Sequence, residues 1–109
     1  MLIGMKLSPT AVAQRLRAAD FGSSLSARGF RFWDDEALGD VVEIVLILDH
    51  EIWDDAAISA CENARAVADK ALSDLPCFAL PVCRTRTEHE AFREREIGLW
   101  LPVEVHGTC

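Results

Sequence analysis

The most constraining feature of the sequence is the almost wholly apolar run at residues 41–48, Val-Val-Glu-Ile-Val-Leu-Ile-Leu. A strand with one solvated face alternates apolar and polar residues, whereas a strand covered on both faces is apolar nearly throughout. The run therefore predicts a strand at the centre of a sheet that is covered on both sides. Its longest uninterrupted apolar part, 44–48, is much shorter than the roughly 20 residues that span a membrane, so we expect no membrane association.

A helix is predicted near the start of the chain. Ser8 is a suitable N-cap, and Pro9 suits the first helical position because its missing N–H is not needed there. Apolar residues at helical spacing follow, and Gly22 is expected to stop the helix. A second, short helical segment is expected around residues 23–25.

A longer and more regular helix is predicted over residues 53–75. Asp54 and Asp55 lie where carboxylates favour a helix N-terminus, and Pro76 disfavours helical geometry at the residue before it. The apolar residues between them form one stripe at helical spacing, rich enough in alanine to lie close against a sheet. The stripe consists of Trp53, Ala57, Ala60, Cys61, Ala64, Val67, Ala68, Ala71 and Leu75.

Three further strands are predicted around the central one. Phe30–Trp33 alternates and is expected to form a hairpin with the central run through the polar turn at 34–40. Phe78–Arg84 is a strand that Pro81 confines to an edge or a bulge, because proline has no N–H for the ladder. Residues 97–105 alternate as a last strand.

These elements follow one another in the order α-β-β-α-β-β. Thr87 and Glu90 have capping-box spacing, so residues 88–95 form either one or two helical turns or a charged hairpin loop. The order predicts a single α+β domain over residues 1–109, with a mostly antiparallel four-stranded sheet and helices packed on it. One domain also agrees with the length of the chain, since single domains usually have about 100–150 residues.

The charge of the chain is acidic and unevenly distributed. The formal net charge is −7, and residues 41–75 hold only Arg65 and Lys70 against eight acidic residues, a net charge of −6. This distribution argues against direct binding of nucleic acid, which calls for a basic patch. Either the acids form a solvated helix face, or they form a surface that binds a basic protein partner.

The candidate partner-binding residues follow from this distribution. They are the acids at the exit of the central strand and on the long helix, with one tryptophan of the last strand. That tryptophan is either buried under the helices or exposed as an aromatic interface anchor. The residues are Asp49, Glu51, Asp54, Asp55, Glu62, Asp69 and Trp100.

Carboxylates also suggest a metal site, although each has a simpler interpretation. The sequence Trp-Asp-Asp occurs twice, so Asp34, Asp35, Asp49 and Asp54 could together bind Mg²⁺ and serve a metal-dependent enzyme. The simpler interpretation places the first pair in a turn and the second at a helix start. We favour the simpler one and expect no metal, no cofactor and no catalytic residues.

The cysteines and histidines do not form a zinc motif. Cys77, Cys83 and His89 lack the Cys-x-x-Cys spacing that is typical of zinc sites, and the histidines are expected to be solvated. Residues 1–7 do not have the pattern of a secretory signal. We therefore expect the four cysteines (Cys61, Cys77, Cys83 and Cys109) to be free thiols and the protein to be cytoplasmic.

From residue 41 onward the order of segments follows a known pattern. The run Val41–Val45 is followed by Asp54–Ala57, which opens the alanine-rich helix, then by Thr85–Glu90 and an alternating strand. This order resembles the second half of phage tail-completion (tail-terminator) proteins. The resemblance implies a ring-forming structural subunit that closes a tail tube through strand and loop contacts, with no catalytic residues to carry over.

Three functional hypotheses result. The first is a non-enzymatic assembly or interaction protein, most like a phage tail-completion subunit that self-associates and enters a virion made in the cytoplasm. The second is a small acidic inhibitor that binds a basic surface of a nucleic-acid-handling complex, in the manner of an anti-CRISPR protein or an antitoxin. The third is the metal-dependent enzyme that would use the Asp carboxylates.

Overall fold

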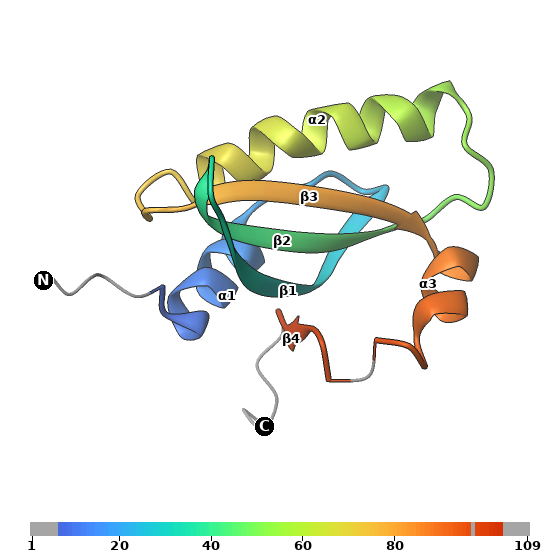
Figure 1. The fold of residues 1–109 in the computed structure, drawn as a ribbon. Helices are drawn as coiled ribbons and strands as arrows, with labels where there is room; N and C mark the ends of the chain where they lie inside the picture. Colours follow the sequence, from blue (N-terminus) through green and yellow to red (C-terminus); the bar gives the residue numbers. More distant parts are fainter. Residues whose placement is uncertain (1–6, 97, 104–109) are drawn as a thin grey trace, which may run out of the picture.

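The computed structural model describes residues 7–96 and 98–103, and Figure 1 shows how they are arranged. Helix α2 runs along the sheet beside β3, whereas α3 lies at the end of the sheet where β3 finishes (Figure 1). This architecture confirms the predicted α+β class with a four-stranded sheet. The described elements are α1 (Pro9–Ala18), β1 (Leu25–Asp35), β2 (Gly39–Leu48), α2 (Asp55–Ala71), β3 (Phe78–Thr85), α3 (Arg86–Phe92) and β4 (Leu101–Pro102).

Strand β2 lies inside the sheet, as its apolar sequence predicts. The strand order is β3-β2-β1-β4. β2 pairs antiparallel with β1 and parallel with β3, and β1 pairs antiparallel with β4. The hairpin, the edge position of the strand that contains Pro81, and the mostly antiparallel character of the sheet are therefore confirmed.

Both faces of β2 are buried, and they are covered in different ways. Its even-numbered residues pack with α1 and α2 into the main core, where the alanines of α2 allow close approach. The odd-numbered Val41, Val45 and Ile47 are almost as completely buried on the opposite side, which we call the second face. By strand register the second face also includes Gly29, Arg31, Trp33, Glu43, Leu80, Val82 and Arg84.

The two longer helices begin at side-chain caps. Ser8 Oγ accepts a hydrogen bond from the Ala11 N–H at 3.3 Å, which confirms the predicted first cap. Asp54 Oδ1 accepts one from the Ala57 N–H at 2.9 Å. Each cap satisfies a backbone donor that the first helical turn leaves without a partner.

Helix α2 is shorter than the predicted 53–75. Because Asp54 is the cap, Trp53 lies before the helix and is exposed instead of joining the apolar stripe. The helix ends at Ala71 because Leu72 leaves helical geometry and packs into the core. The chain then turns toward β3 before it reaches Pro76, so proline does not set the end.

Strand β1 is longer than predicted, and the expected helical segment at residues 23–25 is absent. Leu25 pairs with Leu48 at the far end of β2, and the ladder continues from there to the hairpin turn. Pairing with a long apolar strand thus outweighs the local helical signal. The register shifts between Ala27 and Gly29, which makes Arg28 the extra residue of a β-bulge.

The capping box lies two residues earlier than predicted. The Glu88 N–H donates to Thr85 Oγ1 at 3.1 Å, and the Thr85 N–H donates to the Glu88 carboxylate at 2.8 Å. Of the two structures expected for residues 88–95, the helix is therefore present as far as Phe92, and turns follow it.

The strand predicted over residues 97–105 is much shorter in the structure. Within residues 98–103, Leu101 and Pro102 alone form a ladder with β1, while Ile97 and residues 104–105 lie outside the described residues. Gly98 has a φ of 77°, a left-handed conformation that favours glycine and turns the chain before β4. The alternating sequence alone did not reveal this turn.

Replacing Gly29 with alanine is expected to destabilise the fold. A Cβ at this position would lie 3.0 Å from the Leu101 carbonyl oxygen and 3.1 Å from Trp100 Cβ, so the segment around β4 would have to move. We expect a loss of about 1–3 kcal/mol in the free energy of unfolding, as for other overpacked sites, measured by urea titration. Ser26→Ala, at an exposed position of the same strand, is the control. An unchanged unfolding midpoint in Gly29→Ala would contradict the close packing.

Candidate functional site

The acidic candidates are all exposed and lie on one stretch of the chain. Asp49 and Glu51 belong to the loop between β2 and α2, Asp54 caps α2, and the others lie on α2 itself. Asp55, Glu62 and Asp69 are seven residues apart, so they lie along one side of the helix. We call this set of six acids the acidic surface.

Three of these six acids have a local structural role: one caps α2, and two contact the start of α3. Asp49 Oδ1 lies 4.0 Å from Arg86 Nη2, and Glu51 accepts a hydrogen bond from Thr87 Oγ1 at 2.6 Å. These contacts join the β2–α2 loop to the start of α3. By contrast, no ion pair connects Asp55, Glu62 or Asp69 to another residue in the ranges that the structure describes.

Apolar side chains are exposed in the midst of these acids. Ile52 is 73% exposed, Trp53 41% and Ile58 45%. The first two lie in the β2–α2 loop and the third in the first turn of α2, so all three are close in sequence to Asp54. The sequence prediction placed Trp53 in the buried stripe and overlooked Ile52. The N-cap signal of Asp54 could have shown that Trp53 precedes the helix.

Trp100 does not lie with the acidic surface. It is half-buried against the second face, since its Cβ occupies the space above Gly29. It therefore neither packs under α1 and α2 nor lies fully in solvent. Its indole Nε1–H donates to Glu96 Oε1 at 3.0 Å. The structure therefore separates this residue from the six acids with which the sequence grouped it.

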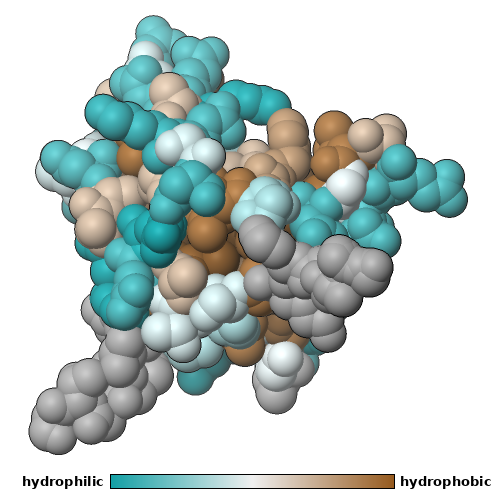
Figure 2. Space-filling view, turned by 90° about the vertical axis from the view of Figure 1, so that its left-hand side faces the viewer, coloured by the Kyte–Doolittle hydropathy of each residue, from teal (hydrophilic) through white to brown (hydrophobic). Residues whose placement is uncertain are grey.

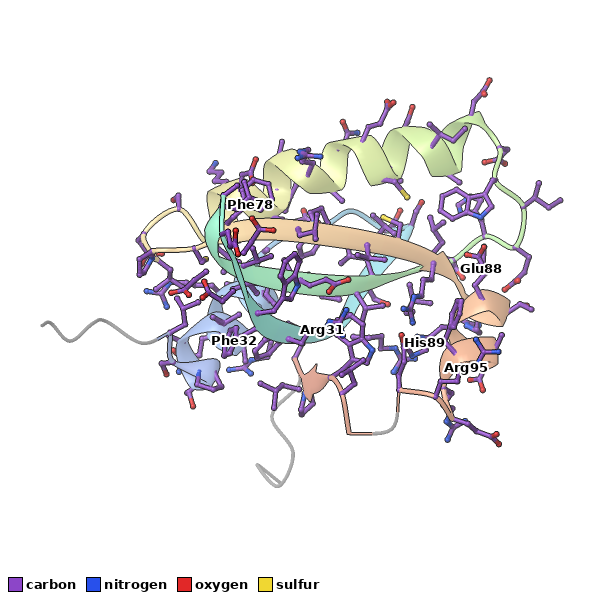
Figure 3. The ribbon with its side chains drawn as sticks, in the orientation of Figure 1. Arg31, Phe32, Phe78, Glu88, His89 and Arg95 are labelled. Atoms are coloured by element: carbon purple, nitrogen blue, oxygen red, sulfur yellow. The ribbon has the colours of Figure 1, made fainter. Side chains whose placement is uncertain are left out.

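Two ion pairs surround Trp100 on the second face. Arg84 makes two hydrogen bonds to the Glu96 carboxylate, at 2.7 and 2.8 Å, and Arg31 Nε donates to Glu43 at 2.7 Å. Arg31 and Arg84 also place their guanidinium carbons 5.0 and 5.6 Å from the centre of a Trp100 ring. These distances are suitable for cation–π attraction. In Figure 3, Arg31 of β1 lies below the middle of the sheet, and His89 lies at α3.

These contacts change the acidities of the groups involved. The hydrogen bonds from Arg84 lower the pKa of Glu96 to about 2, so this carboxyl remains charged at any physiological pH. Burial, and next the charges of Arg84 and Arg28, lower the pKa of His89, whose imidazole is therefore neutral near pH 7. His89 is half-buried, which corrects the expectation that it is solvated.

Cys61, Cys77 and Cys83 are free thiols that pack against the core, as predicted. Burial, together with a hydrogen bond to Cys61, raises the pKa of Cys83 to about 12, so this thiol is protonated and unreactive at neutral pH. Cys109 lies outside the described residues.

The structure does not bring the candidate metal ligands together. Asp34 pairs with Asp40 at the turn of the β1–β2 hairpin, whereas the Asp49 N–H binds the Ser24 carbonyl at the opposite end. Within residues 7–96 and 98–103, no group of three or more His, Cys, Asp or Glu side chains is placed to hold a metal ion. The proposed Mg²⁺ set, and any set built on Cys77, Cys83 and His89, is therefore not assembled.

The pair between Arg84 and Glu96 predicts a dependence of stability on pH. Because the pKa of Glu96 is lowered from 4.5 to about 2 by folding, its contribution is fully present above pH 4.5 and is lost as the pH falls toward 2. Glu96→Gln should be less stable than the parent chain at pH 6, and this difference should shrink by pH 2.5. Urea titrations across this range measure it, with the exposed Glu94→Gln as control. A difference that stays constant with pH would contradict the assignment.

Comparison of the chain with known proteins found no match. No family model, no curated protein and no solved structure matches it. The resemblance to phage tail-completion proteins therefore stays a prediction. Among the described helices, none has both the length and the apolar character needed to cross a membrane.

Proposed function

We propose that the protein is a non-enzymatic interaction protein that binds a basic surface of another protein through its acidic surface. The observation that carries this proposal is the exposure of Ile52, Trp53 and Ile58 among acidic side chains. Single exposed apolar residues are common and need no explanation. Three of them within seven residues, including a tryptophan, have the composition of the centre of a protein interface.

The charges around these residues favour a basic partner. Asp55, Glu62 and Asp69 have no ion-pair partner in the described part of the chain, so an incoming Lys or Arg meets carboxylates that are not already neutralised. Unpaired charges at the rim of an interface accelerate association and select the partner by sign. A protein that handles nucleic acid offers such a basic surface, and this chain would then compete with the phosphates. We expect this interaction in the cytoplasm.

A second candidate function is assembly into an oligomer, as a tail-completion subunit would require. Strand β3 supports it, because β3 pairs with β2 on one side and has no strand partner on its other side among the described residues. A second copy can add a strand to such an edge. Pro81 in the middle of β3 limits how long the added ladder can be.

The acidic surface is tested with a basic peptide in which Arg and Lys flank leucine anchors, titrated into the full chain and followed by NMR. Chemical-shift changes should concentrate on residues 49–62, and binding should weaken as salt is added. Ile52→Asp should lower the affinity about tenfold, since it removes an apolar anchor. Glu62→Lys with Asp69→Lys should lower it several-fold through like-charge repulsion.

The tip of the β1–β2 hairpin provides matched controls. Figure 2 views this end of the molecule, where apolar atoms reach the surface near the centre and hydrophilic atoms surround them. Leu38 is 50% exposed there among acids, so Leu38→Asp matches Ile52→Asp, and Asp34→Lys with Glu36→Lys matches the charge reversal. Equal losses at both ends would show that only net charge matters and would refute a specific acidic surface.

The second candidate is tested by sedimentation equilibrium of the full chain over a range of concentrations. Edge-to-edge assembly predicts a mass that rises from 12.1 kDa to a defined multiple. A strictly monomeric chain at millimolar concentration would contradict self-assembly and leave binding of the basic peptide unaffected. The two proposals can therefore fail separately.

A further inference from the structure

A pocket of about 330 Å³ opens on the second face of the sheet, away from the acidic surface. Its volume is at the lower end of the range for small-molecule sites. Gly29 and Val45 are its buried residues, and half-buried Trp100 contributes an aromatic surface. Arg28 and Arg93, both exposed, line it together with half-buried His89.

The β-bulge explains why Arg28 lines this pocket. As the extra residue of β1, Arg28 is outside the regular pairing with β2, and its carbonyl accepts a hydrogen bond from the Val103 N–H at 3.3 Å. Bulges redirect side chains in this way and are common beside functional sites. The next residue, Gly29, has no Cβ, which leaves room for Trp100 Cβ to pack above it.

The positive charge in the pocket is only partly neutralised. Among the described residues, Glu96 is the one acid that lines it, and this carboxylate already accepts hydrogen bonds from Arg84 and Trp100. Arg93 pairs with Glu90 at 3.2 Å, but both side chains are more than half exposed, and such pairs contribute little and exchange readily. Arg28 makes no ion pair or side-chain hydrogen bond with any residue in the ranges described.

The lowered pKa of His89 is consistent with the arginines placed around this pocket. Its pKa is lowered by burial and then by the charges of Arg84 and Arg28, and the carboxylates of Glu96 and Glu90 do not reverse this effect. Burial is the largest cause of this lowering, and the two arginine charges add to it, although the chain as a whole carries a net charge of −7. A pocket lined by two arginines attracts anions.

We propose that this pocket binds a small molecule with a carboxylate or phosphate group, held by Arg28, Arg93 and His89, and with an aromatic or apolar remainder against Trp100 and Val45. The guanidinium groups supply paired N–H donors that match the geometry of an oxyanion. The indole and the buried valine supply a flat apolar surface for the rest of the ligand. The site lies on the second face, so it does not depend on binding of a partner to the acidic surface.

The test uses phenyl phosphate and benzoate as probes and phenol as the uncharged control, each titrated into the isotope-labelled full chain. Both anions should shift the resonances of the Trp100 indole N–H and the His89 ring in a saturable manner, and should raise the pKa of His89. Arg28→Gln should weaken binding about tenfold, because a hydrogen bond to a charged group is lost. Arg65→Gln, which removes one exposed charge from α2, should leave the affinity unchanged.

The outcomes separate the possibilities clearly. Saturable binding of one anion and not the other supports the site and identifies its ligand as a phosphate or a carboxylate. Phenol binding as tightly as benzoate would overturn the proposal, since the pocket would then select apolar shape alone. Equal affinity in Arg28→Gln and the parent chain, or no response to either anion at millimolar concentration, would overturn it as well. Arg28→Gln keeps the backbone carbonyl that binds Val103, so its fold should be preserved.

Discussion

Burial of β2 on both faces is the constraint on which the rest of the structure depends. One face obtains its cover from α1 and α2, which is the ordinary solution for an α+β sheet. The other face has no long helix over it in the described residues, and its cover near Gly29 comes from Trp100 and from paired arginines and glutamates. Because that cover is polar, the second face combines a buried sheet with charged groups that a ligand can reach.

Much of the fold could be predicted from local sequence, because its main determinants are local. The apolar run defined β2, and Ser8 with Pro9 defined the start of α1. The predictions were wrong where distant pairing or an unrecognised glycine turn decides the outcome. Leu25 is extended because Leu48 pairs with it, and the alternating residues before β4 turn at Gly98 instead of forming a strand.

The sites show the same division between local and distant determinants. The six acids could be recognised from charge alone, and all of them are exposed. The group around Trp100 draws on β1, β2, β3 and the chain after α3, so no sequence window contains it. The placement of Arg28 depends on a one-residue shift of register, which is a property of the paired strands and not of either strand alone. Sequence reasoning could therefore identify a charged surface but not a pocket.

The short length of β4 has a consequence for how the molecule opens. Two residues in a ladder hold this segment weakly, and much of its attachment comes from side chains. Arg84 donates hydrogen bonds to the carboxylate of Glu96, which precedes the segment, and Arg17 donates one to the Val103 carbonyl. Segments with few backbone hydrogen bonds open more easily than the sheet interior, and they do so as separate units. We therefore expect amide protons around Trp100 to exchange with solvent well before those of β2. One wall of the pocket thus belongs to a segment with a very short ladder, and its order would increase when that pocket is filled.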